Sequence, residues 1–188
     1  MHFSLTFFRR WTQILEQGQI AKSCTVLQAR RAKEGDTEPF SPPPIEEVVA
    51  TIKKERPAVV CTPHVETSAG IILPDSYIKA VSDAVHSVGG IFVLDCIASG
   101  CLWIDMKALG VDALISAPQK GWTGPACCAM VMLSKRGLEV ARSTKSSSFT
   151  IDLAQWVTVM EAYEAGEIMQ LKHRNFGRLD PLACASNR

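Results

Sequence analysis

The sequence predicts an α/β fold with a largely parallel sheet and flanking helices. Three short runs, at residues 58–62, 91–94 and 113–115, are apolar at consecutive positions, which is typical of strands buried on both faces. Segments with helical periodicity lie between and beside these runs. Because strands that alternate with helices usually pair in parallel, the three runs are expected to lie in one sheet.

The first predicted helix begins at Ile45 and ends before Pro57. It follows a loop at residues 35–44 that is rich in turn-forming residues, and its apolar side chains recur at helical spacing. Glu46 and Glu47 stand in its first turn, where the helix dipole favours negative charge. This helix therefore leads into the first apolar run.

The second predicted helix connects the first apolar run to the second. It begins at Pro74 and Asp75 and ends at the glycine pair Gly89 and Gly90. A shorter helical piece at residues 106–109 leads to the third apolar run. The order of elements is thus strand, helix, strand, helix, strand.

A last apolar run, at residues 127–133, precedes a predicted helix at residues 135–142. Its periodicity leaves open whether this strand is an antiparallel member of the sheet. After residue 166 the chain offers little apolar face to bury. We therefore expect one domain over residues 1–166 and a divergent, loosely ordered tail over residues 167–188.

The composition argues against several kinds of partner. The 188 residues include 20 lysines and arginines and 19 acidic residues, so no net field attracts nucleic acid or an anionic membrane. No apolar stretch is long enough to span a bilayer, and the N-terminal apolar residues precede Arg9 and Arg10, the reverse of a signal peptide. Seven cysteines show no metal-ligand spacing, so we expect no metal site and a reducing compartment, the cytoplasm.

Polar residues with possible chemistry follow all three of the apolar runs. His64 and Thr67 follow the first run, Asp95 ends the second, and Gln119 and Lys120 follow the third. Ligands of open α/β sheets gather at the carboxyl ends of the strands. Each residue alone has an ordinary explanation, such as a turn-forming aspartate, a solvated lysine or a packed histidine. Their joint appearance in this order predicts a ligand site.

The segments at residues 64–70, 95–99 and 116–120 resemble three cofactor motifs of the class V pyridoxal-phosphate aminotransferases, in particular the alanine–glyoxylate and serine–pyruvate branch. The similarity extends from about Phe7 to Gly166. The resemblance implies a partial large (cofactor) domain of a fold type I enzyme, followed by the divergent tail. It also implies pyridoxal phosphate as cofactor, amino acid and 2-oxo acid substrates, and a homodimer.

The resemblance assigns a role to each candidate residue. Lys120 would form a Schiff base with the cofactor aldehyde and later act as general base. Asp95 would pair with the pyridinium nitrogen and keep it protonated. Thr67 would hydrogen-bond the ring oxygen or the phosphate, Gln119 would lie near the phosphate, and His64 would lie beside or below the ring.

A weaker correspondence concerns Phe7, which would lie over the face of the cofactor ring. The alternative for Phe7 is hydrophobic packing of a terminal segment, and the order of residues around Arg9 and Arg10 departs from the family pattern.

Two elements of the family pattern are not recognised in the sequence: a glycine-rich phosphate-binding turn near the N-terminus and a C-terminal arginine that binds the substrate carboxylate. One alternative is therefore a catalytically impaired, truncated remnant. The other is a different class V chemistry, such as desulfuration or kynurenine cleavage. Gln119 stands where desulfurases usually have a histidine, which disfavours desulfuration.

Overall fold

The computed structural model describes residues 2–4, 9–31, 33–34 and 37–167. Phe7 and all of the predicted tail beyond Glu167 lie outside the described residues. The chain forms two compact units, Met1–Gly137 and Leu138–Arg188. All of the other candidate residues belong to the first unit.

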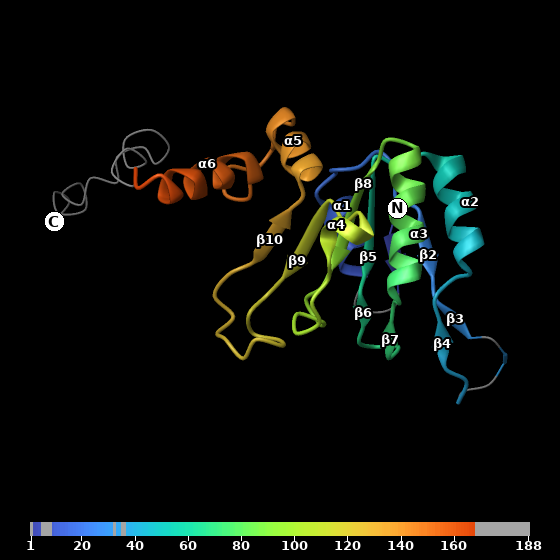
Figure 1. Cartoon of the computed structure of the whole chain (residues 1–188). Helices are drawn as coiled ribbons and strands as arrows, with labels where there is room; N and C mark the ends of the chain where they lie inside the picture. The colour runs from blue at the N-terminus through green and yellow to red at the C-terminus, as the bar shows by residue number, and fades with distance from the viewer. Residues whose placement is uncertain (1, 5–8, 32, 35–36, 168–188) are drawn as a thin grey trace, which may run out of the picture. The chain divides into compact units, whose positions relative to one another are not determined.

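A six-stranded sheet forms the centre of the described part of the first unit (Figure 1). Its strands, in order across the sheet, are β10 (Met130–Leu133), β9 (Ala113–Ser116), β8 (Ile91–Asp95), β5 (Val59–Pro63), β1 (His2–Ser4) and β2 (Val26–Gln28). The pairs are parallel except for β10 with β9, which is antiparallel. The predicted α/β class is confirmed, and the last apolar run is the antiparallel member.

The predicted helices form at the expected places. They are α2 (Ile45–Glu55), α3 (Asp75–Ser87), α4 (Met106–Leu109) and α5 (Lys135–Ser143), and α1 (Arg9–Gln17) precedes them. The α4 helix is short but capped at both ends. The Asp105 side chain accepts from the Ala108 N–H at 2.9 Å, and Gly110 takes the left-handed conformation at the C-cap, with φ 71°.

The hydrophobic core lies between the sheet and the helices α2 and α3. Its buried side chains come from both layers: Val48 and Ile52 of α2, Ile78, Val81 and Val85 of α3, and Val60, Phe92, Leu94 and Leu114 of the strands. These strand residues share one face of the sheet by the register of the pairs. Burial of this face accounts for most of the hydrophobic stabilisation of the unit.

On β8 and β9 the opposite face of the sheet is less covered than the sequence predicts, whereas on β5 it is buried as well. In β8, Phe92 and Leu94 are buried, whereas Val93 and Asp95 are only half-buried. The strand β9 alternates in the same way. The sequence predicts burial on both faces because consecutive side chains of these strands are apolar. In the described residues, however, the helices α2 and α3 cover one face only.

Two small antiparallel pairs accompany the main sheet. The pair β3 (Arg30–Arg31) and β4 (Phe40–Ser41) lies in and beside the segment predicted to be a loop. The pair β6 (Val65–Glu66) and β7 (Ile71–Ile72) is a hairpin, and Thr67 lies in its turn. Gly70 closes this turn with φ 66°, a left-handed conformation that favours glycine.

The second unit contains α6 (Leu153–Glu164), a helix that the sequence analysis did not predict. The side chain of Asp152 caps it by accepting from the Ala154 N–H at 2.9 Å. An ion pair joins Arg142 of α5 to Glu161 of α6. Among the described helices, none is long and apolar enough to cross a membrane.

Candidate functional site

The carboxyl ends of β5, β8 and β9 meet at one edge of the sheet (Figure 1). The register pairs Pro63 with Asp95 and Asp95 with Ile115. The backbone N–H of Cys96 also donates to the carbonyl of Ile115 at 2.8 Å, which continues the β8–β9 contact beyond the strands. The predicted residues that follow these strands therefore share one edge, as the sequence analysis expected for ligand-binding side chains.

Asp95 ends β8 with a half-buried carboxylate. The Ile97 N–H donates to its Oδ1 at 3.0 Å and the Trp11 Nε1–H donates to its Oδ2 at 3.3 Å. Burial raises the pKa of Asp95, these two hydrogen bonds lower it, and the nearby Glu66 raises it further; burial has the largest effect. Within the described residues, no basic side chain forms an ion pair with Asp95. This carboxylate would thus be stabilised by a cation that approaches it.

His64 is held firmly next to Asp95. Its N–H donates to the Asp95 carbonyl at 2.9 Å, and its own carbonyl accepts from the Leu73 N–H at 2.9 Å. Its Nδ1 lies 2.8 Å from the Ser99 Oγ, and both side chains are only 4% exposed. Burial lowers the pKa of His64, although Asp75 acts in the opposite direction. The ring is therefore neutral at neutral pH and fixed in orientation through Nδ1.

Ser99 and Glu66 are site residues to which the sequence analysis gave no role. Glu66 is buried in β6 and accepts from the Ser68 N–H at 3.1 Å and from the Ser68 Oγ at 2.7 Å. This contact shapes the turn that carries the exposed Thr67. Both residues lie inside the segments that resemble cofactor motifs, and this position is the sequence feature that could have identified them. Their hydrogen-bond partners depend on the fold.

Gln119 and Lys120 lie in the loop at residues 117–129, between β9 and β10, and both are exposed. Lys120 forms no ion pair with any of the described residues. Thr123, three residues later, has φ 54°, a left-handed conformation that strains a β-branched residue.

The loop around Lys120 is anchored to the segment after β8. The Cys101 Sγ donates to the Gly121 carbonyl at 2.7 Å, and the Trp122 Nε1–H donates to the Gly100 carbonyl. A Cβ atom at Gly121 would lie 2.6 Å from the Cys101 Sγ, so glycine permits this close approach. The backbone next to Lys120 is thus positioned by a neighbouring loop, while the lysine side chain is exposed.

The structure brings some of the predicted residues into contact and leaves others apart. His64 and Asp95 are joined by a backbone hydrogen bond. Lys120, Gln119 and Thr67 follow strands at the same end of the sheet, but among the described residues they form no hydrogen bond with Asp95 or His64. The side-chain roles given to these residues therefore remain predictions.

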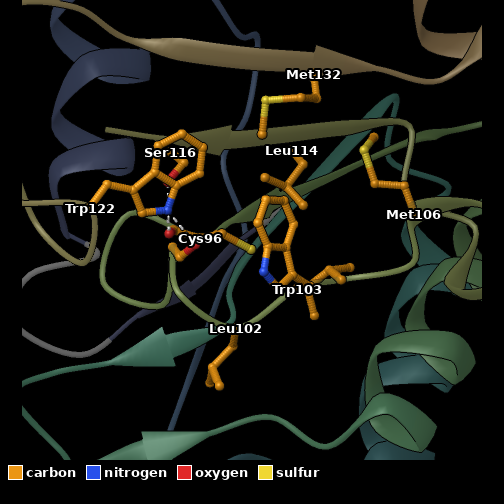
Figure 2. Close-up of a pocket in the computed structure, with 10 residues that line it drawn as sticks. Cys96, Leu102, Trp103, Met106, Leu114, Ser116, Trp122 and Met132 are labelled. Carbon is orange, nitrogen blue, oxygen red and sulfur yellow. Dashed lines mark hydrogen bonds between the residues drawn. The ribbon is translucent and has the colours of Figure 1, made fainter. Parts of the chain in front are cut away.

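A cavity of about 200 Å³ lies near this edge and is lined mainly by apolar side chains (Figure 2). Its lining includes Leu114 and Met132, which pair across β9 and β10, and also Trp103 and Trp122, whose ring centroids lie 6.2 Å apart. None of the five described candidate residues lines it. Leu114 is on the core face of the sheet and Asp95 is on the opposite face, so this cavity is separate from the candidate site.

Comparisons with known proteins give a consistent picture. The family model described as Aminotransferase class-V matches residues 22–169. Alanine–glyoxylate aminotransferase 1 of Saccharomyces cerevisiae is 28% identical over 131 residues, which are 66% of this chain and 33% of that protein. (S)-Ureidoglycine–glyoxylate transaminase of Bacillus subtilis is 30% identical over 102 residues, 53% of this chain and 24% of that protein.

Solved structures agree in fold. The ureidoglycine–glyoxylate aminotransferase of Bacillus subtilis superposes with a TM-score of 0.70 at 24% identity, over 94% of this chain and 42% of that chain. The aspartate aminotransferase of subgroup IV from Thermus thermophilus gives a TM-score of 0.64 at 26% identity, over 88% and 43%. The matched part of the chain thus corresponds to between 24% and 33% of the length of these two curated relatives.

Proposed function

Because the chain belongs to the class-V aminotransferase family, we propose that it is part of an enzyme that moves an amino group between an amino acid and a 2-oxo acid with pyridoxal phosphate. One observation carries this proposal. The half-buried Asp95, the fixed neutral His64 and the loop of Lys120 follow three adjacent parallel strands at one sheet edge. That arrangement suits a ring with a basic nitrogen and an aldehyde.

The described residues fit this cofactor at its ring nitrogen. The carboxylate of Asp95 is desolvated and has no cationic partner in the described part of the chain. A pyridinium N–H would supply both the missing positive charge and a hydrogen bond. When bound, pyridoxal phosphate supplies an electron sink for the α-carbon of the amino acid. Asp95 maintains that property by holding the proton on the ring nitrogen.

Lys120 would supply the amine that holds the cofactor and a general base that moves a proton of the substrate. Two features support this role. The side chain is exposed, so its amine is accessible to a ligand, and the backbone of the loop is positioned by the Cys101–Gly121 hydrogen bond. His64 provides a neutral, immobile surface for the ring. Thr67 would supply a hydroxyl for the ring oxygen or the phosphate, Gln119 an amide near the phosphate, and Phe7, outside the described residues, an aromatic face.

The same proposal includes a homodimer and a cytoplasmic location. Apolar side chains are exposed on the edge strand β10, such as Val131, and in the segment between β8 and α4, such as Trp103. Their exposure supports burial against a second copy. All of the described cysteines are free thiols, three of them exposed, which suits a reducing compartment.

The test is covalent attachment of the cofactor. Purified chain is mixed with pyridoxal phosphate, dialysed, reduced with borohydride and mapped by peptide mass spectrometry. We expect a yellow protein and a label at Lys120, with no label after Lys120→Ala and an unchanged label after the control substitution Lys107→Ala. A label at Lys107 or Lys135 in the parent would refute the assignment of Lys120. Loss of all colour on dialysis, with no label, would instead support the inactive remnant.

A further inference from the structure

The loop that carries Lys120 also carries two adjacent cysteines that the proposed reaction does not use. Cys127 and Cys128 lie shortly before β10, and the Cys127 N–H donates to the Pro125 carbonyl at 2.9 Å. Both side chains are exposed. The Cys127 thiol donates a hydrogen bond to the Cys128 Sγ, and the two Sγ atoms lie 3.9 Å apart.

We propose that Cys127 and Cys128 form a two-thiol binding site for a trivalent arsenical, a soft electrophile that bonds both sulfurs at once. Thiolate sulfur is the ligand that soft centres prefer. Trivalent arsenic is trigonal pyramidal, so an arsenic atom bonded to both sulfurs holds them at or just inside van der Waals contact of each other. The two Sγ atoms, 3.9 Å apart, already lie near such contact, so a small rotation about the Cα–Cβ bonds brings them to the separation that arsenic requires.

A direct disulfide suits the pair less well than a bridging atom. A disulfide needs its sulfurs about 2.04 Å apart and its Cα atoms at least about 4.4 Å apart. Neighbouring residues joined by a trans peptide have Cα atoms only about 3.8 Å apart. An atom inserted between the sulfurs relieves both constraints, because the sulfurs then stay close to their present separation.

A divalent metal ion also suits the pair less well. A tetrahedral ion wants four ligands, and the described residues contain no group of three or more His, Cys, Asp or Glu side chains placed to hold one. A metal must also displace the thiol protons, and the hydrogen bond with Cys127 raises the pKa of Cys128.

The arsenical needs no such ionisation in its overall reaction. The oxygen of an aryl arsenic(III) oxide takes the proton of each thiol and leaves as water, while two arsenic–sulfur bonds form. Arsenic stays trivalent and no electrons are exchanged, so no oxidant or reductant is required. The reaction requires only two exposed thiols whose sulfurs can bond to the same arsenic atom.

The probe is phenylarsine oxide, added to the folded chain and followed by native mass spectrometry. We expect one arsenical per chain, retained in excess 2-mercaptoethanol and removed by dithiothreitol, because only a dithiol can compete with a chelate. Cys127→Ser and Cys128→Ser should each weaken binding by about a hundredfold or more, the gain that closure of a second bond within one chain provides. Cys24→Ser, which alters a half-buried thiol outside this loop, should leave it unchanged.

Circular dichroism of each variant establishes that the fold is retained before binding is compared. Undiminished retention in either Cys127→Ser or Cys128→Ser would overturn the proposal, as would complete removal by 2-mercaptoethanol from the parent chain.

Discussion

Two aspartates at opposite ends of the strands differ in whether a basic side chain is paired with their carboxylate. Asp112 precedes β9 at its amino end and is 2% exposed. His86 Nε2 and Arg136 Nη1 both donate to its Oδ2 at 2.9 Å, and the Phe92 N–H donates at the same distance. Asp95 ends β8 at its carboxyl end, with two hydrogen bonds and, in the described residues, no cation.

The difference separates a structural carboxylate from a candidate functional one. A buried charge with its full set of partners ties elements together, and Asp112 joins β8, α3 and the start of α5 in this way. A desolvated charge without a cation destabilises the fold on its own and is favoured only where something else binds it. The carboxylate at the amino end of the strands therefore stabilises the fold, whereas the carboxylate at the carboxyl end is available to a ligand.

The largest expected effect comes from exchanging each aspartate for asparagine. Asp112→Asn should lower the free energy of unfolding by about 3 kcal/mol, near the low end for a broken buried ion pair because Arg136 and His86 are partly exposed. Asp95→Asn should change it by less than about 1 kcal/mol, and in the stabilising direction, since it removes an uncompensated charge. Urea unfolding of both variants measures the difference. Equal losses would mean that Asp95 is a structural residue too.

Two glycines, one at each end of the strands, are expected to differ in the stability that they lose on substitution by alanine. A Cβ at Gly137 would lie 2.3 Å from the backbone oxygen of Asp112, whereas a Cβ at Gly121 would lie 2.6 Å from the Cys101 Sγ. Gly137→Ala should therefore cost about 3 kcal/mol of unfolding free energy and Gly121→Ala about 1 kcal/mol, because a side-chain sulfur moves more easily than backbone. The check is thermal and urea unfolding of both variants, and a larger loss for Gly121→Ala would contradict this ranking.

Local sequence patterns predicted the helices, the strands and the residues that follow them. Apolar periodicity is a local property, so Ile45–Glu55 and Asp75–Ser87 were readable as helices without any tertiary information. The partners of the site residues were not readable, because His64 and Ser99 are 35 residues apart and Trp11 and Asp95 are 84 apart. The α6 helix was missed, since it buries none of its residues.

The pH dependence of stability tests the same carboxylate. The folded pKa of Asp95 lies above its ordinary value of 3.8, chiefly through burial. The fold therefore binds the proton more tightly than the unfolded chain does, and stability from this group falls as pH rises from 3.8 through the folded pKa. Asp95→Asn removes this loss, so its advantage over the parent should grow across that window and be absent well below it. An advantage that is constant with pH would show that Asp95 does not titrate as described.

The smallest expected effect concerns His64. Its folded pKa is below the ordinary value of 6.5, because burial disfavours the imidazolium, and Asp75 opposes this effect. A lowered histidine pKa means that stability from this group is lost as pH falls from 6.5 through the folded pKa. Asp75→Asn removes the only favourable charge in that balance, so the pKa of His64 should fall further.

Proton-detected titration of the His64 ring resonances measures this directly, with Asp83→Asn on the same helix as the matched control. The Asp83 carboxylate is paired with Lys79 and has no part in the His64 balance, so its loss should leave the titration in place. A pKa of His64 that rises in Asp75→Asn would contradict the sign of the Asp75 effect. A pKa well above 6.5 in the parent would mean that the ring is charged near neutral pH. His64 would then repel the ring cation that Asp95 is proposed to hold, and the two residues could not serve one site.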